Sequence, residues 1–323
     1  MTRRDFLLAI ALLLAGAPAA VRPQQPRKVP VIGRLSTSSA GPNSSVNEAL
    51  RKGLRDLGYI EGRDFIMEHR SSKSRNEQLP HLADELVRLK VDVIVTGTDE
   101  ATRAAKQATS TIPIVAILYN SPVSSGLIDS FNHPGGNITG IATRHTELVA
   151  KRLELLKEIV PGLTRVTVLS DALSSQELNQ LKVAAPQLGI QLRIIELDVR
   201  YDLESAFRTA KRQRSGAAMV LTSPEFYARA ARIGSLALDT GMPTSSSFRD
   251  ITESGGLMSY STDVRDGFYR AAYFIDRILK GAEPRDLPFE QIDVKLLLNA
   301  KTVKALGLTI PQSILLRADE VLK

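Results

Sequence analysis

The chain has 323 residues, four histidines and no cysteine, and it carries a formal net charge of +7 at pH 7. Without cysteine, disulfides, zinc–thiolate sites and cysteine nucleophiles are excluded. Its basic residues are scattered, it has no tryptophan, and only 5% of its residues are aromatic, so we expect no nucleic-acid partner. The length predicts two domains rather than one.

Residues 1–19 follow the plan of a secretory signal peptide. Arg3 and Arg4 precede an apolar core at 6–14, and Ala17-Pro18-Ala19 fits the small-residue cleavage pattern. The core is too short for a membrane span, which needs about 20 residues, although an uncleaved N-terminal anchor is an alternative. The paired arginines also resemble a twin-arginine export signal. We expect a soluble periplasmic protein with a cleaved signal peptide, and no lipoprotein, because the chain lacks cysteine.

The first part of the mature chain alternates strand and helix patterns. Short apolar or β-branched runs predict strands at 29–35, 64–69, 91–95, 112–118 and 138–142. Apolar residues at helical spacing predict helices across 46–57, 79–87 and 101–108. Strand–helix–strand units of this kind have right-handed crossovers and build parallel sheets. The turn PGGN at 134–137, with the short strand 138–142 that follows it, is interpreted as the first passage to a second lobe.

A second alternation of the same kind begins at residue 148. It predicts helices at 148–160, 225–238 and 264–279, and strands at 165–170, 190–197, 216–222, 243–247 and 291–298. Further helices are expected between the first three of these strands, and a short helix after the last strand. The run GGLMSY at 255–260 is interpreted as a second crossing between lobes.

Together these patterns predict an α/β fold of two Rossmann-like lobes with parallel sheets, joined by a hinge that the chain crosses several times. The N-terminal lobe is expected at 29–141 and 263–290, and the C-terminal lobe at 142–262 and 291–323. A ligand is expected in the cleft between the lobes, where the strand ends of both sheets meet.

The sequence contains none of the common catalytic or nucleotide-binding motifs. There is no G-x-G-x-x-G after the first strand, no P-loop and no G-x-S-x-G nucleophile elbow. The four histidines, His69, His81, His133 and His145, have no partner at metal-ligand spacing. We therefore expect no enzyme, no cofactor and no metal site.

Small polar residues follow the predicted strands, at the sheet edge where parallel sheets bind their ligands. The candidate ligand-binding residues are Ser36, Thr37, Thr98, Asp99, Asn120, Ser121, Ser170, Asp171, Ser223, Phe248 and Arg249. Arg249 could pair with a carboxylate in bidentate fashion, and Asp99 or Asp171 could accept from an ammonium group. The alternative for each serine, threonine and aspartate is that it only caps a helix.

From residue 29 to the end, the chain contains the stretches GLRDLGYIEG (53–62), LADELV (82–87), AAKQATSTIPIV (104–115), PGGNITG (134–140), KRLELLK (151–157), GGLMSY (255–260) and ALGLTIP (305–311). Together these stretches resemble one family, the exported substrate-binding proteins of ABC transporters, and within it the ABC substrate-binding family that includes tryptophan- and tyrosine-type binders. The chain departs from its relatives at 121–122, where they often carry Asp-Pro, and at 171–172, where they often carry Asn-Pro.

The resemblance implies a type I periplasmic-binding fold that closes on a small ligand, for example an amino acid or another carboxylate. It also implies delivery to an ABC permease in the inner membrane that works with a cytoplasmic ATPase. A periplasmic ligand sensor that docks on a membrane kinase or chemoreceptor is the alternative with the same fold. An exported enzyme that uses the cleft is the third alternative.

Overall fold

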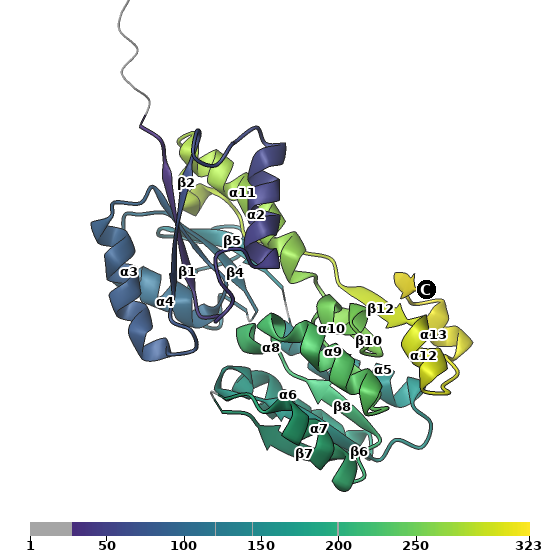
Figure 1. The fold of residues 1–323 in the computed structure, drawn as a ribbon. Coiled ribbons are helices and arrows are strands. Elements are labelled where there is room, and N and C mark those ends of the chain that lie inside the picture. The colour runs from purple at the N-terminus through teal and green to yellow at the C-terminus, as the bar shows by residue number, and fades with distance from the viewer. Residues whose placement is uncertain (1–27, 120, 144, 199) are drawn as a thin grey trace, which may run out of the picture.

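The computed structural model describes residues 28–119, 121–143, 145–198 and 200–323, which form two α/β lobes, one above the other in Figure 1. The predicted signal peptide at 1–19 and Asn120 lie outside these ranges. The two lobes and their mainly parallel sheets confirm the predicted fold class. In the ranges that the structure describes, no helix combines the length and the apolar character that a membrane crossing requires.

The first lobe contains a six-stranded sheet in which all neighbours are parallel. Its order is β11-β5-β4-β3-β1-β2. Five strands come from the first half of the chain, and β11 comes from near the end. The strands are β1 (Val31–Ser36), β2 (Ile66–Ser71), β3 (Val93–Thr96), β4 (Ile114–Leu118), β5 (Ile138–Ala142) and β11 (Glu290–Gln291).

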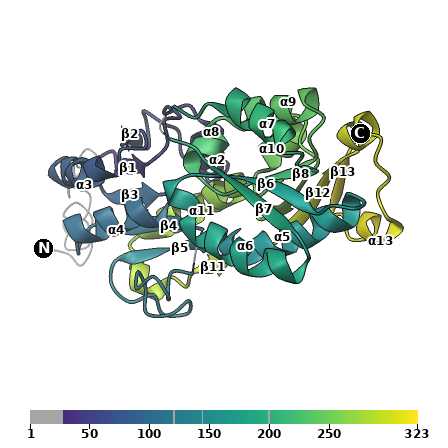
Figure 2. The same cartoon turned by 90° about the horizontal axis from the view of Figure 1, so that it is seen from below.

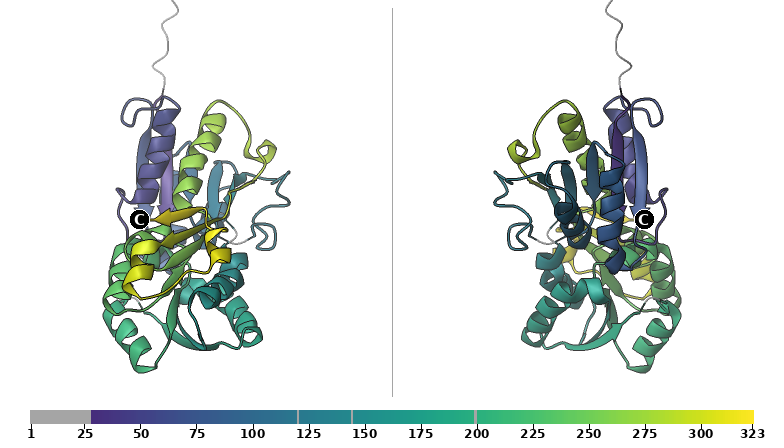
Figure 3. Two further views of the ribbon diagram at one scale, coloured as in Figure 1. Left: turned by 90° about the vertical axis from the view of Figure 1, so that its right-hand side faces the viewer. Right: turned by 90° about the vertical axis from the view of Figure 1, so that its left-hand side faces the viewer.

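Helices cover both faces of this sheet (Figure 3). On one face α2 (Ser45–Asp56) packs beside α11 (Val264–Leu279), a helix that returns from the last quarter of the chain. These two helices approach closely at Gly53, where a Cβ atom would lie 2.4 Å from the carbonyl oxygen of Tyr269. The other face is covered by α3 (Leu79–Arg88) and α4 (Asp99–Ala108), and the 3₁₀ turn η1 (Asn76–Gln78) leads into α3.

The second lobe contains a seven-stranded sheet in the order β13-β12-β10-β9-β8-β6-β7. Its strands are β6 (Arg165–Ser170), β7 (Gln191–Glu196), β8 (Ala217–Val220), β9 (Thr244–Ser246), β10 (Met258–Ser261), β12 (Lys295–Asn299) and β13 (Glu320–Leu322). One pair, β10 and β12, is antiparallel. The chain reaches β12 directly from the first lobe, without the helical crossover that a parallel neighbour requires, so β12 runs in the opposite direction.

Helices also cover both faces of the second sheet (Figures 1 and 3). One face carries α5 (His145–Ile159), α6 (Ser175–Gln187), α12 (Ala300–Ala305) and α13 (Gln312–Leu315). The other face carries α7 (Leu203–Arg212), α8 (Pro224–Ala228), α9 (Ala230–Asp239) and α10 (Arg249–Glu253). Two further 3₁₀ turns are η2 (Ala172–Ser174) and η3 (Pro284–Asp286).

Three element predictions need correction. The helix expected at 225–238 is divided into α8 and α9, because Arg229 leaves helical geometry with φ −109° and ψ 14°. The single strand expected at 291–298 is two short strands, β11 and β12, which belong to different sheets. The run at 255–260 enters strand β10, and the second crossing follows this strand. The exact lobe boundaries stay a prediction.

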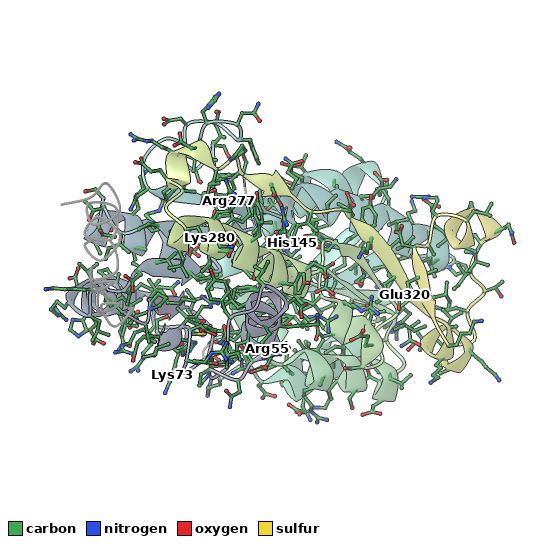
Figure 4. The ribbon with its side chains drawn as sticks, turned by 90° about the horizontal axis from the view of Figure 1, so that it is seen from above. Arg55, Lys73, His145, Arg277, Lys280 and Glu320 are labelled. Carbon is green, nitrogen blue, oxygen red and sulfur yellow. The ribbon has the colours of Figure 1, made fainter. Side chains whose placement is uncertain are left out.

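The chain passes between the lobes after β5, after β10 and after β11, and the first two of these crossings are hydrogen-bonded to each other. The Thr262 hydroxyl donates to the carbonyl oxygen of Thr143 at 3.1 Å, and His145 Nε2 lies 3.1 Å from the same hydroxyl. His145 is fully buried, stacks on Tyr119 at 5.1 Å and lies near the middle of the molecule in Figure 4. Burial, followed by nearby Arg152, lowers the pKa of His145 to about 3, so this ring is neutral at physiological pH.

Candidate functional site

A cleft lies between the lobes at the carboxyl ends of the strands, and it has two adjoining sections. Thr98, Tyr119 and Pro224 line both sections. The first, called here the Arg34 section, is also lined by Arg34, Ser36, Thr37, Ser38, Ala40, Ser44, Val46, Gly97, Tyr227 and Phe268. The second, called here the Glu177 section, is also lined by Asp99, Glu100, Thr146, Leu173, Ser174, Gln176, Glu177 and Thr222.

The Arg34 section is built mainly by β1 and the loop after it. That loop carries three serines and a threonine between β1 and α2, and each brings a short side chain with a hydroxyl group. The Arg34 guanidinium lies over the ring of Phe268, 4.7 Å from its centroid. Burial lowers the pKa of Arg34 to about 10, so the side chain remains a cation at neutral pH. This section therefore combines hydroxyl groups, aromatic rings and one buried cation.

The Glu177 section is built around a buried ion pair between α5 and α6. Arg152, which is fully buried, pairs with the carboxylate of Glu177. Glu177 also accepts the backbone N–H of Thr222 at 2.5 Å and the Thr222 hydroxyl at 3.1 Å. Burial is the main cause that lowers the pKa of Arg152, and Glu177 counteracts it. Through Glu177, the ion pair is thus hydrogen-bonded to the segment that follows β8.

The first lobe contributes two more carboxylates to the Glu177 section, at the start of α4. Thr98 caps this helix by accepting the backbone N–H of Ala101 at 3.3 Å. Asp99 and Glu100 follow in the first turn, where the helix dipole favours negative charge. Burial raises the pKa of Glu100. The section is consequently acidic on the side that the first lobe supplies.

The two lobes touch each other across the Arg34 section, and three of the contacts, between Ser39 and Glu225, Ser38 and Pro224, and Ser45 and Tyr227, are called here the closure contacts. Glu225 accepts the backbone N–H of Ser39 at 2.6 Å and the Ser39 hydroxyl at 2.7 Å. The Ser38 hydroxyl donates to the carbonyl oxygen of Pro224 at 3.3 Å, and the hydroxyls of Ser45 and Tyr227 lie 2.6 Å apart. Figures 1 and 2 show α8, which carries these second-lobe groups, next to α2. The structure therefore has the lobes closed.

Four of the predicted site residues line this cleft, namely Ser36, Thr37, Thr98 and Asp99. The others lie beside it or elsewhere. Ser223 caps α8, next to the lining residue Pro224. Asp171 caps η2 and accepts the Tyr201 hydroxyl at 2.7 Å. Ser170 and Phe248 are buried, and Phe248 packs against His145 and Tyr227. Ser121 is partly buried after β4.

Arg249 lies outside the cleft, which corrects the expectation that it would pair with a ligand carboxylate. Its guanidinium pairs with Glu320 on β13 at 2.6 Å and with Glu253 at 2.5 Å. Figure 4 places Glu320 on the second lobe, well away from His145 at the hinge. These two carboxylates, with Glu320 the larger contributor, raise the pKa of Arg249. Arg249 therefore joins two elements of the second lobe.

Several residues of the cleft were missed from the sequence: Arg34, Tyr119, Glu177, Tyr227 and Phe268. The sequence could have indicated Arg34, because a charged residue within an otherwise apolar strand is seldom buried unless it has a partner or a function. Glu177 looked like an ordinary solvent-exposed charge on a helix, since nothing in the local sequence shows that its partner is Arg152. As for metals, no group of acidic or histidine side chains suited to holding an ion occurs in the ranges that the structure describes.

Gly97 is expected to be required for the shape of the Arg34 section. A Cβ atom there would lie 2.8 Å from Cζ of Phe268 and 3.1 Å from Nη2 of Arg34. We expect Gly97→Ala to displace both groups and to lower the free energy of unfolding by about 1–3 kcal/mol, measured by urea denaturation. Gly41→Ala is the control, because nothing lies within 4 Å of its Cβ position. Equal stability of the two variants would contradict this prediction.

The fold and the cleft define a two-lobe ligand-binding protein. The family model for ABC transporter substrate binding proteins matches residues 28–322, so the chain belongs to this family. It is 25% identical over 264 residues, covering 80% of this chain and 75% of the relative, to a tyrosine-binding protein of Clostridioides difficile strain R20291.

Two solved structures share the fold. One is a conserved domain protein from Vibrio cholerae, with a TM-score of 0.78 and 24% identity, covering 91% of this chain and 100% of that one. The other is an ABC domain from Streptococcus pneumoniae in complex with L-Trp, with a TM-score of 0.77 and 23% identity, covering 91% of this chain and 99% of that one.

Proposed function

We propose that this protein is an exported periplasmic receptor that captures a small polar ligand in its cleft and delivers it to an ABC importer. The importer would consist of a permease in the inner membrane and its cytoplasmic ATPase. The observation that carries the proposal is a cleft lined from both lobes and bridged by the closure contacts, because such a cleft can enclose a small ligand between two lobes. The predicted signal peptide at 1–19, with its twin-arginine pattern, supports the periplasmic location.

An amino acid is the ligand class that the cleft favours. The carboxylates of Asp99 and Glu100 offer acceptors for an ammonium group, and the rings of Tyr227 and Phe268 offer an apolar wall for a side chain. The names of the relatives, a tyrosine-binding protein and a domain in complex with L-Trp, support the same class. Because these relatives are described by what they bind, we propose binding without catalysis.

A thermal-shift screen of the mature chain tests this function. The panel contains aromatic and branched amino acids, other carboxylates, nucleosides and sugars. A ligand present at 100 times its dissociation constant should stabilise the folded chain by about 2.7 kcal/mol, which is a clear rise in melting temperature. A folded chain that responds to no compound would contradict the proposal.

The delivery step is tested separately in cells. A strain that lacks this protein should lose uptake of the ligand that the screen identifies, and a plasmid copy should restore it. Unchanged uptake combined with a lost kinase or chemotaxis response would favour the ligand-sensor alternative.

A further inference from the structure

Arg34 is a buried cation held in one orientation by neutral groups. Arg34 is part of β1, and only 4% of its surface is exposed. Nε donates to Oδ1 of Asn47 at 3.1 Å, and Nη1 donates to the carbonyl oxygens of Leu35 and Val95. The ring of Phe268 covers one face of the guanidinium. These contacts fix the side chain before any ligand arrives.

The charge of Arg34 is not neutralised by its surroundings. Across the described ranges, no carboxylate lies within ion-pair distance of Arg34, and Nη2 has no hydrogen-bond partner. A buried charge is costly unless it is paired. Nη2 faces Gly97, which lines the cleft and has no side chain to cover it. Nη2 of Arg34 therefore lies at the wall of the Arg34 section, where it can donate to a ligand.

A second buried donor in the same section also lacks a partner. Thr37 is 2% exposed, and its hydroxyl has no hydrogen-bond partner among the described residues. Ser36 Oγ accepts the backbone N–H of Ser38 at 3.2 Å, which leaves its hydroxyl hydrogen free to be donated. Arg34, Ser36 and Thr37 thus present three donors to a section that none of the described carboxylates lines.

We propose that Arg34, together with the hydroxyls of Ser36 and Thr37, recognises an anionic group of the ligand, either a carboxylate or a phosphate or sulfonate. The proposal rests on the proposed receptor function and adds a specificity-determining residue to it. The anion supplies the countercharge that Arg34 lacks, and several oxygen acceptors for the unpartnered donors. The acidic Glu177 section next to it then receives the opposite, cationic or neutral end of the ligand.

The test compares matched acidic and uncharged probes on the wild type and on Arg34→Gln and Arg34→Lys. The probes are L-tyrosine with L-tyrosinamide, L-tryptophan with L-tryptophanamide, inorganic phosphate, methylphosphonate, and one uncharged sugar and nucleoside. Dissociation constants are measured by calorimetry. Arg270→Gln is the control, because it removes an arginine of the same lobe that pairs with Glu290 at the surface.

We expect the wild type to prefer an anionic probe over its uncharged counterpart by about 10- to 100-fold. Arg34→Gln should lose this preference, Arg34→Lys should keep part of it, and Arg270→Gln should keep all of it. Preference for an amino acid identifies the group as a carboxylate, and preference for phosphate or methylphosphonate identifies it as a phosphoryl-type anion. A purely structural role would lower affinity for acid and amide alike.

Two results overturn the inference. The first is that no anionic probe binds the wild type more tightly than it binds Arg34→Gln. The second is that Arg34→Gln loses affinity for an acid and for its amide by the same factor, which would leave the receptor function standing and remove only the role of Arg34. Failure of every probe, charged and uncharged, on the wild type would instead contradict both proposals together.

Discussion

Replacing Glu177 by glutamine is expected to lower the free energy of unfolding by about 3–5 kcal/mol. The change removes the only carboxylate that pairs with Arg152 among the described residues, and it leaves a fully buried cation without a countercharge. Urea unfolding of the ligand-free chain measures the effect. Ligand affinity should fall as well, because Glu177 lines the cleft and holds the end of β8 through Thr222.

Glu154→Gln is the matched control for this prediction. Glu154 pairs with Lys151 on the same helix, but both side chains are about two-fifths exposed, and exposed pairs contribute about 0–1 kcal/mol. A second control adds Arg152→Met to Glu177→Gln, which removes the unpaired charge and should recover part of the lost stability. The prediction is wrong if Glu177→Gln and Glu154→Gln unfold at the same urea concentration.

Replacing Glu225 by alanine is expected to speed ligand dissociation about 10- to 100-fold, because Glu225 makes two of the hydrogen bonds that hold the lobes together and both are charge-assisted. The ligand itself need not touch this residue. Stopped-flow release measures the rate, and small-angle scattering of the ligand-bound chain should show a larger radius of gyration. Glu225→Gln keeps one acceptor and should have the smaller effect.

The closure contacts should also make ligand binding depend on pH. Burial alone would raise the pKa of Glu225, but hydrogen bonds from Ser74, Ser39 and Arg229 outweigh it and lower the pKa below the usual 4.5. A lowered pKa means that closure is favoured above pH 4.5 and weakens as the pH falls through the lower value. Affinity should thus stay constant from neutral pH to about pH 5 and then decline. The same decline in Glu225→Gln would exclude this carboxyl as its cause.

The architecture of the fold could be predicted because apolar periodicity records which side of an element is buried. Strand β6 and helix α11 lie within the limits expected from their apolar residues alone. Apolar periodicity predicted the wrong element limits where the apolar spacing continues although the helix or strand ends. The apolar spacing runs on from α8 into α9, although the chain bends at Arg229, and the apolar run at the end of the chain continues across the hinge between β11 and β12.

The site was predictable only as far as strand ends define it. Ser36, Thr37, Thr98 and Asp99 line the cleft, and the sequence could point to them because they lie at or shortly after the carboxyl ends of β1 and β3. Charged residues were misjudged because their role depends on partners that are distant in sequence. Arg249 meets Glu320, 71 positions away, whereas Arg34 meets only neutral groups. The local sequence does not show which arginine has a carboxylate partner in the fold. Arg249, which is paired, was therefore chosen as a candidate, and Arg34, which lines the cleft, was missed.

The late return of α11 and β11 to the first lobe has a consequence for how the chain folds. The hydroxyl of Tyr269 on α11 donates to Asp56 at the end of α2, and these residues are 213 positions apart. During synthesis the first lobe therefore lacks one layer of its core until the second lobe has largely emerged, and neither lobe is complete alone. Such non-local contacts slow folding. The chain should consequently fold as one cooperative unit after synthesis, with a single unfolding transition instead of one for each lobe.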